Sequence, residues 1–221
     1  MRPVKGPPPT LCAWLFDLDG TLMDTDDQAV ARLARRLGPL GSTRARRLAR
    51  HMVMSAESPL NLALTLADVV GLDPWVFALR RRLSRQVTPT FRLIPGVRPL
   101  LESLATQHPL GIVSTRSRDD AEAFVAQHGL EKLFAVIVTQ ESTRRLKPHR
   151  EPIDFAAHAL GVAPVECAMV GDTTVDVRAA RSAGAWAVAV LCGFGERREL
   201  ARAGAHLILP STGDLLAWLE G

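Results

Sequence analysis

Two aspartates, Asp17 and Asp19, stand one residue apart in the stretch DLDGT, directly after an apolar segment at 11–16. Side chains two positions apart on an extended backbone share a face, so both carboxylates can address one small volume. Carboxylates crowded together repel each other unless a cation or a proton intervenes. Because neither Asp has a Cys or His beside it, the cation indicated is a hard, oxygen-binding one, most simply Mg²⁺. The simpler alternative is a polar turn, in which Asp and Gly are common residues.

Four other polar residues of interest lie in the second half of the chain, close to apolar segments. Ser114 follows LGIV at 110–113, Lys147 is one of only three lysines, and Asp172 and Asp176 lie in GDTTVD. Each of the last three has a structural alternative. Lys147 can be a loop lysine on the surface. Asp172 can cap the helix that follows it, and Asp176 can compensate the dipole of that helix.

The order of predicted elements indicates an α/β fold with a doubly wound parallel sheet. Short apolar segments without polar alternation are typical of strands buried on both faces of such a sheet. Strands that alternate with helices pair in parallel, and their carboxyl ends lie along one edge, where the polar residues that follow them are expected to converge. We expect strands at 11–16, 110–113, 133–139, 167–170, 185–191 and 207–209, and helices at 96–106, 117–129, 151–160, 175–183 and 213–219.

Residues 25–90 carry a different pattern and are predicted to form an inserted helical domain. Apolar residues recur there at helical spacing, in segments bounded by Gly, Pro or Ser. The core of the fold is therefore expected to consist of residues 11–24 and 91–221. Residues 1–10, MRPVKGPPPT, are predicted to be a flexible lead, because they are rich in Pro and lack the apolar centre of a secretory signal.

The composition argues against several classes of protein. The 221 residues are 47% hydrophobic and 23% charged, the ordinary balance of a globular protein. No segment reaches the roughly 18 uninterrupted apolar residues of a membrane span, so no membrane association is expected. Arg residues are concentrated in 25–90, but without interleaved aromatic residues they indicate solvated helix faces and not nucleic-acid binding. Three cysteines without metal-ligand spacing indicate reduced thiols and a cytoplasmic location.

Four motifs in order along the chain resemble those of the haloacid dehalogenase superfamily, specifically its phosphatases with a helical cap inserted after the first motif. A further segment, FRLIPGVRPLL at 91–101, resembles the one that re-enters the core after the cap. The resemblance extends over nearly the whole chain beyond Thr10. The four motifs are DLDGT at 17–21, an apolar segment that ends in Ser114, Lys147 followed by Pro148, and GDTTVD at 171–176.

The resemblance implies a phosphatase that is similar to phosphoglycolate phosphatases and acts on a small phosphorylated metabolite, either phosphoglycolate-like or a sugar phosphate. Asp17 would attack phosphorus and form an aspartyl-phosphate. Asp19 would protonate the leaving alcohol and later activate the hydrolytic water. Ser114, Thr115 and Lys147 would contact the phosphoryl group. At position 115 the family commonly has Asn, and this chain departs from that pattern with Thr115.

The resemblance also implies how a metal would be held. Mg²⁺ would be bound by Asp17, by the backbone carbonyl of Asp19 and by Asp172. Asp176 would lie in the outer shell of the ion. Catalysis of phosphoryl transfer is expected to come from two effects, which are the neutralisation of charge by the bound Mg²⁺ and the positioning of the phosphoryl group.

Other members of the superfamily carry out different reactions, and individual residues discriminate among them. A dehalogenase lacks the second acid of the pair, so Asp19 argues against it. A phosphonoacetaldehyde hydrolase needs a cap lysine, and no Lys lies in 25–90. A β-phosphoglucomutase usually has His where this chain has Ala29. A phosphomutase-type or dehalogenase-type member, or a non-catalytic phosphate-binding protein, is the alternative. Candidates for contacts with the rest of the substrate are Arg44, Arg47 and His51.

Overall fold

The computed structural model describes residues 7, 8, 10–24 and 91–221. Contacts between residues divide the chain into two units, Met1–Thr25 with Phe91–Gly221, and Asp26–Thr90. The helical domain predicted for 25–90 lies outside the described residues, as does most of the lead predicted for 1–10. Both stay predictions.

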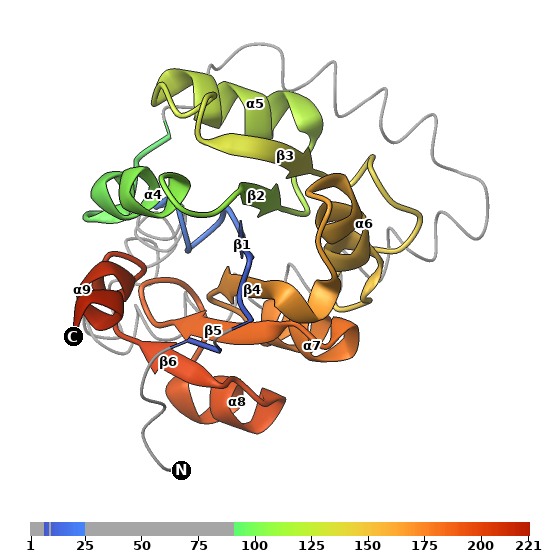
Figure 1. Cartoon of the computed structure of the whole chain (residues 1–221), viewed down its shortest axis with the longest axis vertical. Coiled ribbons are helices and arrows are strands. Elements are labelled where there is room, and N and C mark those ends of the chain that lie inside the picture. Colours follow the sequence, from blue (N-terminus) through green and yellow to red (C-terminus); the bar gives the residue numbers. More distant parts are fainter. Residues whose placement is uncertain (1–6, 9, 25–90) are drawn as a thin grey trace, which may run out of the picture. The chain divides into compact units, whose positions relative to one another are not determined.

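Six parallel strands form one sheet at the centre of the first unit. In chain order they are β1 (Ala13–Phe16), β2 (Leu110–Val113), β3 (Phe134–Val138), β4 (Cys167–Gly171), β5 (Trp186–Val190) and β6 (Leu207–Leu209). Their order across the sheet is β3-β2-β1-β4-β5-β6, and every neighbouring pair is parallel. The chain builds outward from β1 to β3, returns to β1 with β4, and then builds outward the other way (Figure 1). The predicted doubly wound parallel sheet is confirmed.

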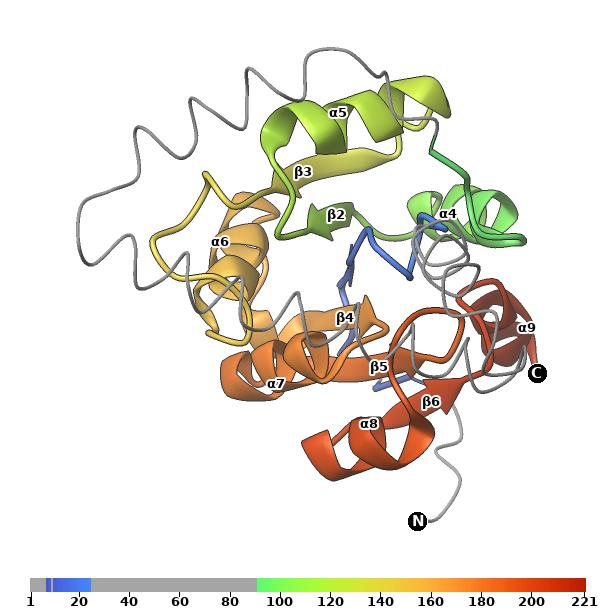
Figure 2. The same cartoon turned by 180° about the vertical axis from the view of Figure 1, so that it is seen from behind.

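Helices follow the strands and cover both faces of the sheet. They are α4 (Val97–Ala105), α5 (Arg118–Gln127), α6 (Glu151–Ala159), α7 (Thr174–Ala183), α8 (Arg197–Ala203) and α9 (Asp214–Glu220), with a short 3₁₀ turn, η2 (Pro164–Glu166), before β4. Helices α4 and α9 lie on one side of the sheet and α6 and α7 on the other, as Figures 1 and 2 show from opposite directions. The sheet is thus the middle layer of three.

Both faces of the sheet are buried because β1, at its centre, is apolar at every position. Trp14 and Phe16 belong to a hydrophobic core that α4, α5 and α9 complete, whereas Ala13 and Leu15 belong to a second core that α6 and α7 complete. All four side chains are at most 1% exposed. Full burial of one large apolar side chain contributes roughly 1.5–3 kcal/mol. Strand β1 therefore fixes the point at which Asp17 leaves the sheet.

Two elements differ from the expectation. Helix α8 is not predicted from the sequence, because RRELARA buries only Leu200 and so shows no apolar period. Strand β3 is expected to be buried on both faces, but it lies at the edge of the sheet, where Ala135 is exposed. Apolar content alone does not distinguish an edge strand from a central one, because even an edge strand packs its side chains against helices.

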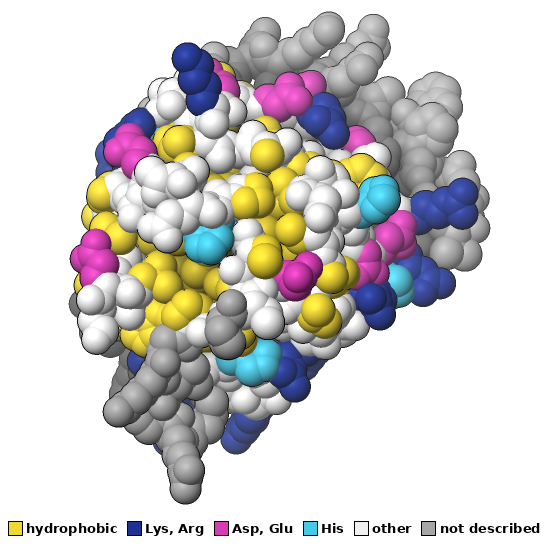
Figure 3. Space-filling view, in the orientation of Figure 1, with side chains coloured by type: hydrophobic (Ala, Val, Ile, Leu, Met, Phe, Trp, Pro, Cys, Tyr) yellow, Lys and Arg dark blue, Asp and Glu magenta, His cyan; other side chains and the backbone are white. Residues whose placement is uncertain are grey.

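The surface of the first unit mixes apolar and charged side chains. On the face seen in Figure 1, hydrophobic side chains gather in the middle and Lys and Arg lie mainly near the rim (Figure 3). Within the described ranges, no helix has both the length and the apolar character needed to cross a bilayer.

Candidate active site

Three neighbouring strands end in polar residues at the same edge of the sheet. Asp17 follows β1, Ser114 follows β2 and Asp172 follows β4, and in the sheet β1 lies between β2 and β4. The winding direction of the chain reverses between β1 and β4, which is where open α/β sheets bind ligands outside the carboxyl ends of their strands. Asp176 reaches the same place from the first turn of α7. The predicted convergence of residues distant in the sequence is thus present for these positions.

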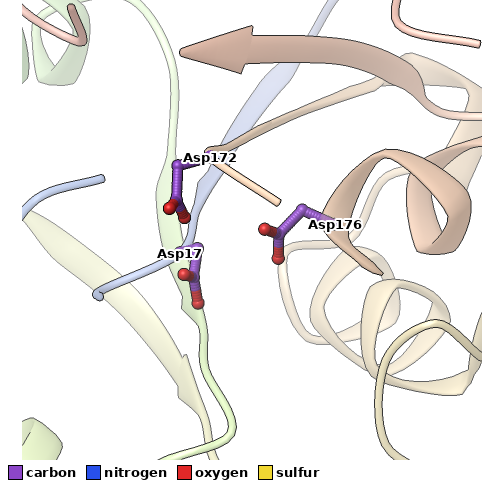
Figure 4. Close-up of side chains that lie close together, drawn as sticks. All are labelled: Asp17, Asp172 and Asp176. Atoms are coloured by element: carbon purple, nitrogen blue, oxygen red, sulfur yellow. The ribbon is translucent and has the colours of Figure 1, made fainter. Parts of the chain in front are cut away.

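Three carboxylates come together at this reversal point. Asp17, Asp172 and Asp176 each offer an oxygen within 4.8 Å of the others, and all three residues are buried (Figure 4). Carboxylates this close repel each other unless positive charge is held among them. Three oxygen ligands from carboxylates suit a hard divalent cation such as Mg²⁺. The residues present therefore fit the metal site that the sequence predicts at this edge.

The carboxylate of Asp172 is held by backbone that approaches it closely. Its Oδ2 accepts a hydrogen bond from the backbone N–H of Phe194 at 2.6 Å, and its Oδ1 accepts one from the Thr21 hydroxyl at 3.4 Å. A Cβ placed on Gly193 would lie 2.0 Å from Oδ2 of Asp172. Only glycine lets the loop after β5 pass this close. The N-cap of α7 is Thr173, so the alternative that Asp172 caps this helix is wrong.

Lys147 supplies positive charge inside the cluster. Its Nζ donates to Oδ1 of Asp17 at 2.7 Å, to Oδ1 of Asp176 at 2.6 Å and to the carbonyl of Val113 at 2.8 Å. These three bonds use every proton of the ammonium. The side chain is 3% exposed, so the alternative of a surface lysine is wrong. The three contacts bring together the ends of β1 and β2 and the start of α7.

Burial and charge act in opposite directions on these groups. Burial raises the pKa of Asp17 to about 7, and the Lys147 ammonium limits that rise. Burial also opposes the charge of Lys147, but Asp17 and Asp176 outweigh it and hold the pKa of Lys147 above its usual value. The ammonium is therefore charged at neutral pH, and the ionised form of Asp17 depends on positive charge nearby.

Asp176 has two roles at once. Its Oδ2 accepts from the backbone N–H of Thr173 at 3.0 Å and from the Thr173 hydroxyl at 2.6 Å. The backbone N–H of Asp176 donates in turn to the Thr173 hydroxyl oxygen at 3.4 Å, which completes a capping box at the start of α7. Its Oδ1 contacts Lys147. The alternative of a purely helix-stabilising Asp therefore accounts for only one of its two oxygens.

Asp19 lies in a different environment from Asp17. Both of its carboxylate oxygens accept hydrogen bonds from Arg116, Oδ2 from Nε and Oδ1 from Nη2, each at 2.6 Å. This side chain is 25% exposed and that of Arg116 is 28% exposed. The Arg116 guanidinium also lies 5.9 Å from the centre of the Phe91 ring. Asp19 is thus the partner of a fixed, partly exposed arginine.

Ser114 and Thr115 form the turn after β2. Ser114 is buried, and its backbone N–H donates to the carbonyl of Val138 at 2.9 Å. The Ser114 hydroxyl accepts a hydrogen bond from the backbone N–H of Arg116 at 3.1 Å. Thr115 is half-buried beside it. Contact of either residue with a phosphoryl group stays a prediction.

Comparison with known proteins identifies the family. The sequence model of the haloacid dehalogenase-like hydrolases matches residues 14–190. The chain belongs to this family.

Relatives of this haloacid dehalogenase-like hydrolase include enzymes with different names. It is 36% identical to the phosphoglycolate phosphatase of Synechococcus elongatus, over 92% of this chain and 95% of the relative. It is 27% identical to the pyrophosphatase PpaX of Bacillus mycoides, over 93% and 95% of the two chains. A haloacid dehalogenase-like hydrolase from Bacteroides fragilis has the same fold, with a TM-score of 0.73, 24% identity, and coverage of 93% of this chain and 99% of that one.

In this hydrolase one residue that contacts the site is missing from the sequence-based set. No motif in the sequence predicts a role for Arg116, although its Nε and Nη2 donate hydrogen bonds to both carboxylate oxygens of Asp19. The available signal is its position, two residues after Ser114 at the end of a strand, the same spacing that joins Asp17 and Asp19. Arg44, Arg47 and His51, the candidates for contacts with the rest of the substrate, lie outside the described residues.

Proposed function

We propose that this hydrolase is a Mg²⁺-dependent phosphatase that cleaves a small phosphorylated metabolite through an aspartyl-phosphate. The observation that carries the proposal is the buried cluster of Asp17, Lys147, Asp172 and Asp176 at the reversal point of the sheet. Within these four residues, three carboxylates face one ammonium. The excess of two negative charges is what a divalent cation would match.

The residues take the following parts in the reaction. An oxygen of Asp17 attacks phosphorus, and the bond between phosphorus and the leaving oxygen breaks, so that the phosphoryl group is joined to Asp17. Asp19 gives a proton to the leaving oxygen. In the second half, Asp19 takes a proton from water, the water oxygen attacks the same phosphorus, and phosphate leaves with Asp17 regenerated.

The other residues hold charge and position. Lys147 keeps Asp17 oriented through the 2.7 Å contact and offsets its charge. Ser114 and Thr115 contact the phosphoryl oxygens from the end of β2. Lys147 contacts the same oxygens by exchanging one of its three bonds for a phosphoryl oxygen. Fixed donors and charges of this kind stabilise the charge of the transferring phosphoryl group.

Mg²⁺ would be held by Asp17, Asp172 and the backbone carbonyl of Asp19, with Asp176 in an outer position. When bound, it neutralises phosphoryl oxygens and lines up the attacking and leaving atoms. The buried oxygens of Asp17 and Asp172, which already lie within 4.8 Å of each other, support this assignment.

The relatives' names narrow the substrate class. Phosphoglycolate carries a carboxylate beyond its phosphoryl group, and pyrophosphate carries a second phosphoryl group. Both are small, and both are anionic on the leaving-group side. We therefore take a small phosphate compound with a charged leaving group as the class to test first, in the cytoplasm, where such metabolites are found.

The test is Mg²⁺-dependent release of phosphate from p-nitrophenyl phosphate, followed by a screen of phosphorylated metabolites. The expected result is turnover that EDTA abolishes and added Mg²⁺ restores. A hydroxylamine-labile phosphoenzyme, trapped by acid quench from a labelled substrate, is expected in the wild type and not in Asp17→Asn. Absence of release with every substrate, combined with tight binding of a phosphate analogue, would instead indicate a non-catalytic phosphate-binding protein.

A further inference from the structure

Arg116 is a cation at the site that the proposed chemistry does not use. All three donors of Lys147 are taken by the carboxylate cluster and by Val113. The Arg116 guanidinium is fixed on both oxygens of Asp19. Its Nη1 also lies 3.9 Å from Oδ2 of Asp120. The described site therefore holds one buried cation, and a second that is 28% exposed.

The position of Arg116 relative to the reaction follows from the role of Asp19. In the proposed function, Asp19 exchanges a proton with the leaving-group oxygen. A guanidinium bonded at 2.6 Å to both oxygens of Asp19 is therefore close to whatever the substrate carries next to that leaving oxygen. The ring of Phe91 beneath the guanidinium further restricts where it can move.

The shape of the guanidinium selects what it can bind. Its paired N–H groups match the two oxygens of a carboxylate or a phosphoryl group, as they match those of Asp19. An anionic group on the substrate can thus take the place of the Asp19 carboxylate as the partner of Arg116, with similar geometry. Because the charge-assisted bonds are exchanged and not lost, the replacement leaves Arg116 paired and lets the Asp19 side chain turn toward the leaving oxygen.

We propose that Arg116 is a specificity-determining residue that binds a second anionic group, a carboxylate or a phosphoryl group, on the leaving-group side of the substrate. The inference rests on the proposed phosphatase function. A substrate without the second anion leaves Arg116 on Asp19 and so forgoes both the added contact and the release of Asp19. The enzyme is then selective for phosphate compounds that carry a second anionic group.

The kinetic test compares two substrates that differ in one group, phosphoglycolate and ethyl phosphate. The readout is the ratio of their kcat/KM values in wild type, Arg116→Gln and Arg116→Lys. We expect Arg116→Gln to lower this ratio about 30- to 100-fold, the scale of a lost charge-assisted pair in a polar site. Arg116→Lys keeps the charge without the fork and is expected to fall between. The matched control is Arg118→Gln, an arginine two residues on that pairs with Glu122 on the surface, and it should leave the ratio unchanged.

A binding test separates this inference from the proposed function. In 3-phosphonopropionate and propylphosphonate a CH2 group replaces the bridging oxygen of the two substrates, so they are non-hydrolysable counterparts, and their Kd values are measured by calorimetry with Mg²⁺ present. We expect Arg116→Gln to weaken the binding of 3-phosphonopropionate at least tenfold more than that of propylphosphonate. If the wild type binds the ligand with the carboxylate more tightly than the one without it, and Arg116→Gln removes that preference, but no phosphate compound is turned over, the proposed function fails and the recognition role of Arg116 stands. If Arg116→Gln weakens both ligands, or slows both substrates, by the same factor, Arg116 only orients Asp19 and the inference is overturned.

Discussion

The two acids of DLDGT lie in contrasting environments, although only one residue separates them. Asp17 is buried against Lys147 and two further carboxylates. The side chain of Asp19 is 25% exposed, and it is paired with Arg116, which is itself partly exposed. The first environment fixes charge in one geometry. The second offers a partner that can be exchanged. Together with the proposed function, the difference predicts that the phosphoryl side of the site is rigid and that the leaving-group side adapts to the substrate.

The largest expected effect is on turnover, and it belongs to the buried half of the site, which consists of Asp17, Lys147, Asp172 and Asp176. The exposed half is Asp19 with Arg116. Asp17→Asn keeps the shape of the side chain but removes the nucleophilic oxygen, so kcat should fall by at least about 10⁴-fold while the protein stays folded. Steady-state kinetics and circular dichroism check both parts. The matched control is Asp119→Asn, which changes an exposed acid at the start of α5 and should have near-normal kcat. Near-normal turnover of Asp17→Asn would show that Asp17 is not the nucleophile.

Removal of Lys147 should damage both activity and stability. Lys147→Met keeps similar bulk but leaves the buried carboxylates of Asp17 and Asp176 without their ammonium. Leaving a buried charge uncompensated costs roughly 3–5 kcal/mol of unfolding free energy. Urea unfolding measures this, with Lys132→Met, an exposed lysine, as the control. Equal stability of the two variants would mean that the cluster is not held together by charge.

The buried half should also show a pH-dependent stability. Because the pKa of Asp17 rises from 3.8 to about 7 on folding, the folded protein holds this proton more tightly than the unfolded chain. The resulting stabilisation is complete below about pH 4 and is lost as the pH rises to about 7. In metal-free buffer, Asp17→Asn should therefore gain stability relative to wild type over that range, by at most about 4 kcal/mol. Parallel stability curves for the two proteins would contradict the raised pKa.

The smallest expected change in stability belongs to the exposed half. Asp19→Asn removes an ion pair whose two side chains are each about a quarter exposed, so the unfolding free energy should change by less than about 1 kcal/mol. Turnover should nevertheless fall about 10²- to 10³-fold, because the proton donor is lost. A large fall in melting temperature, with kcat preserved, would show that Asp19 serves structure and not catalysis.

The part of the site that the sequence predicts is the part that follows from topology. Asp17 and Asp172 each follow an apolar strand of a parallel sheet, so their meeting at one edge can be inferred from strand order alone. The same reasoning places Ser114. Residues that arrive from loops are harder: the burial of Lys147 depends on how the segment after β3 folds back, and a loop lysine is otherwise expected on the surface.

The contact between Arg116 and Asp19 could not be predicted, because it depends on side-chain direction over several bonds. The two residues are 97 positions apart, and only the folded geometry shows that one guanidinium spans both oxygens. Helix α8 is missed for a related reason. Its single buried side chain, Leu200, gives no period, and the helix forms because the segment between β5 and β6 must cross the sheet.

The complete enclosure of the Lys147 ammonium makes that residue a chemical reporter. The chain has three lysines, at 5, 132 and 147, so amine acylation produces few products and the modified peptides are readily told apart by mass spectrometry. With its three protons engaged and its side chain 3% exposed, Lys147 can react only when the ends of β1, β2 and α7 separate. The rate of labelling at Lys147 relative to Lys132 therefore measures how often the ends of β1 and β2 and the start of α7 move apart.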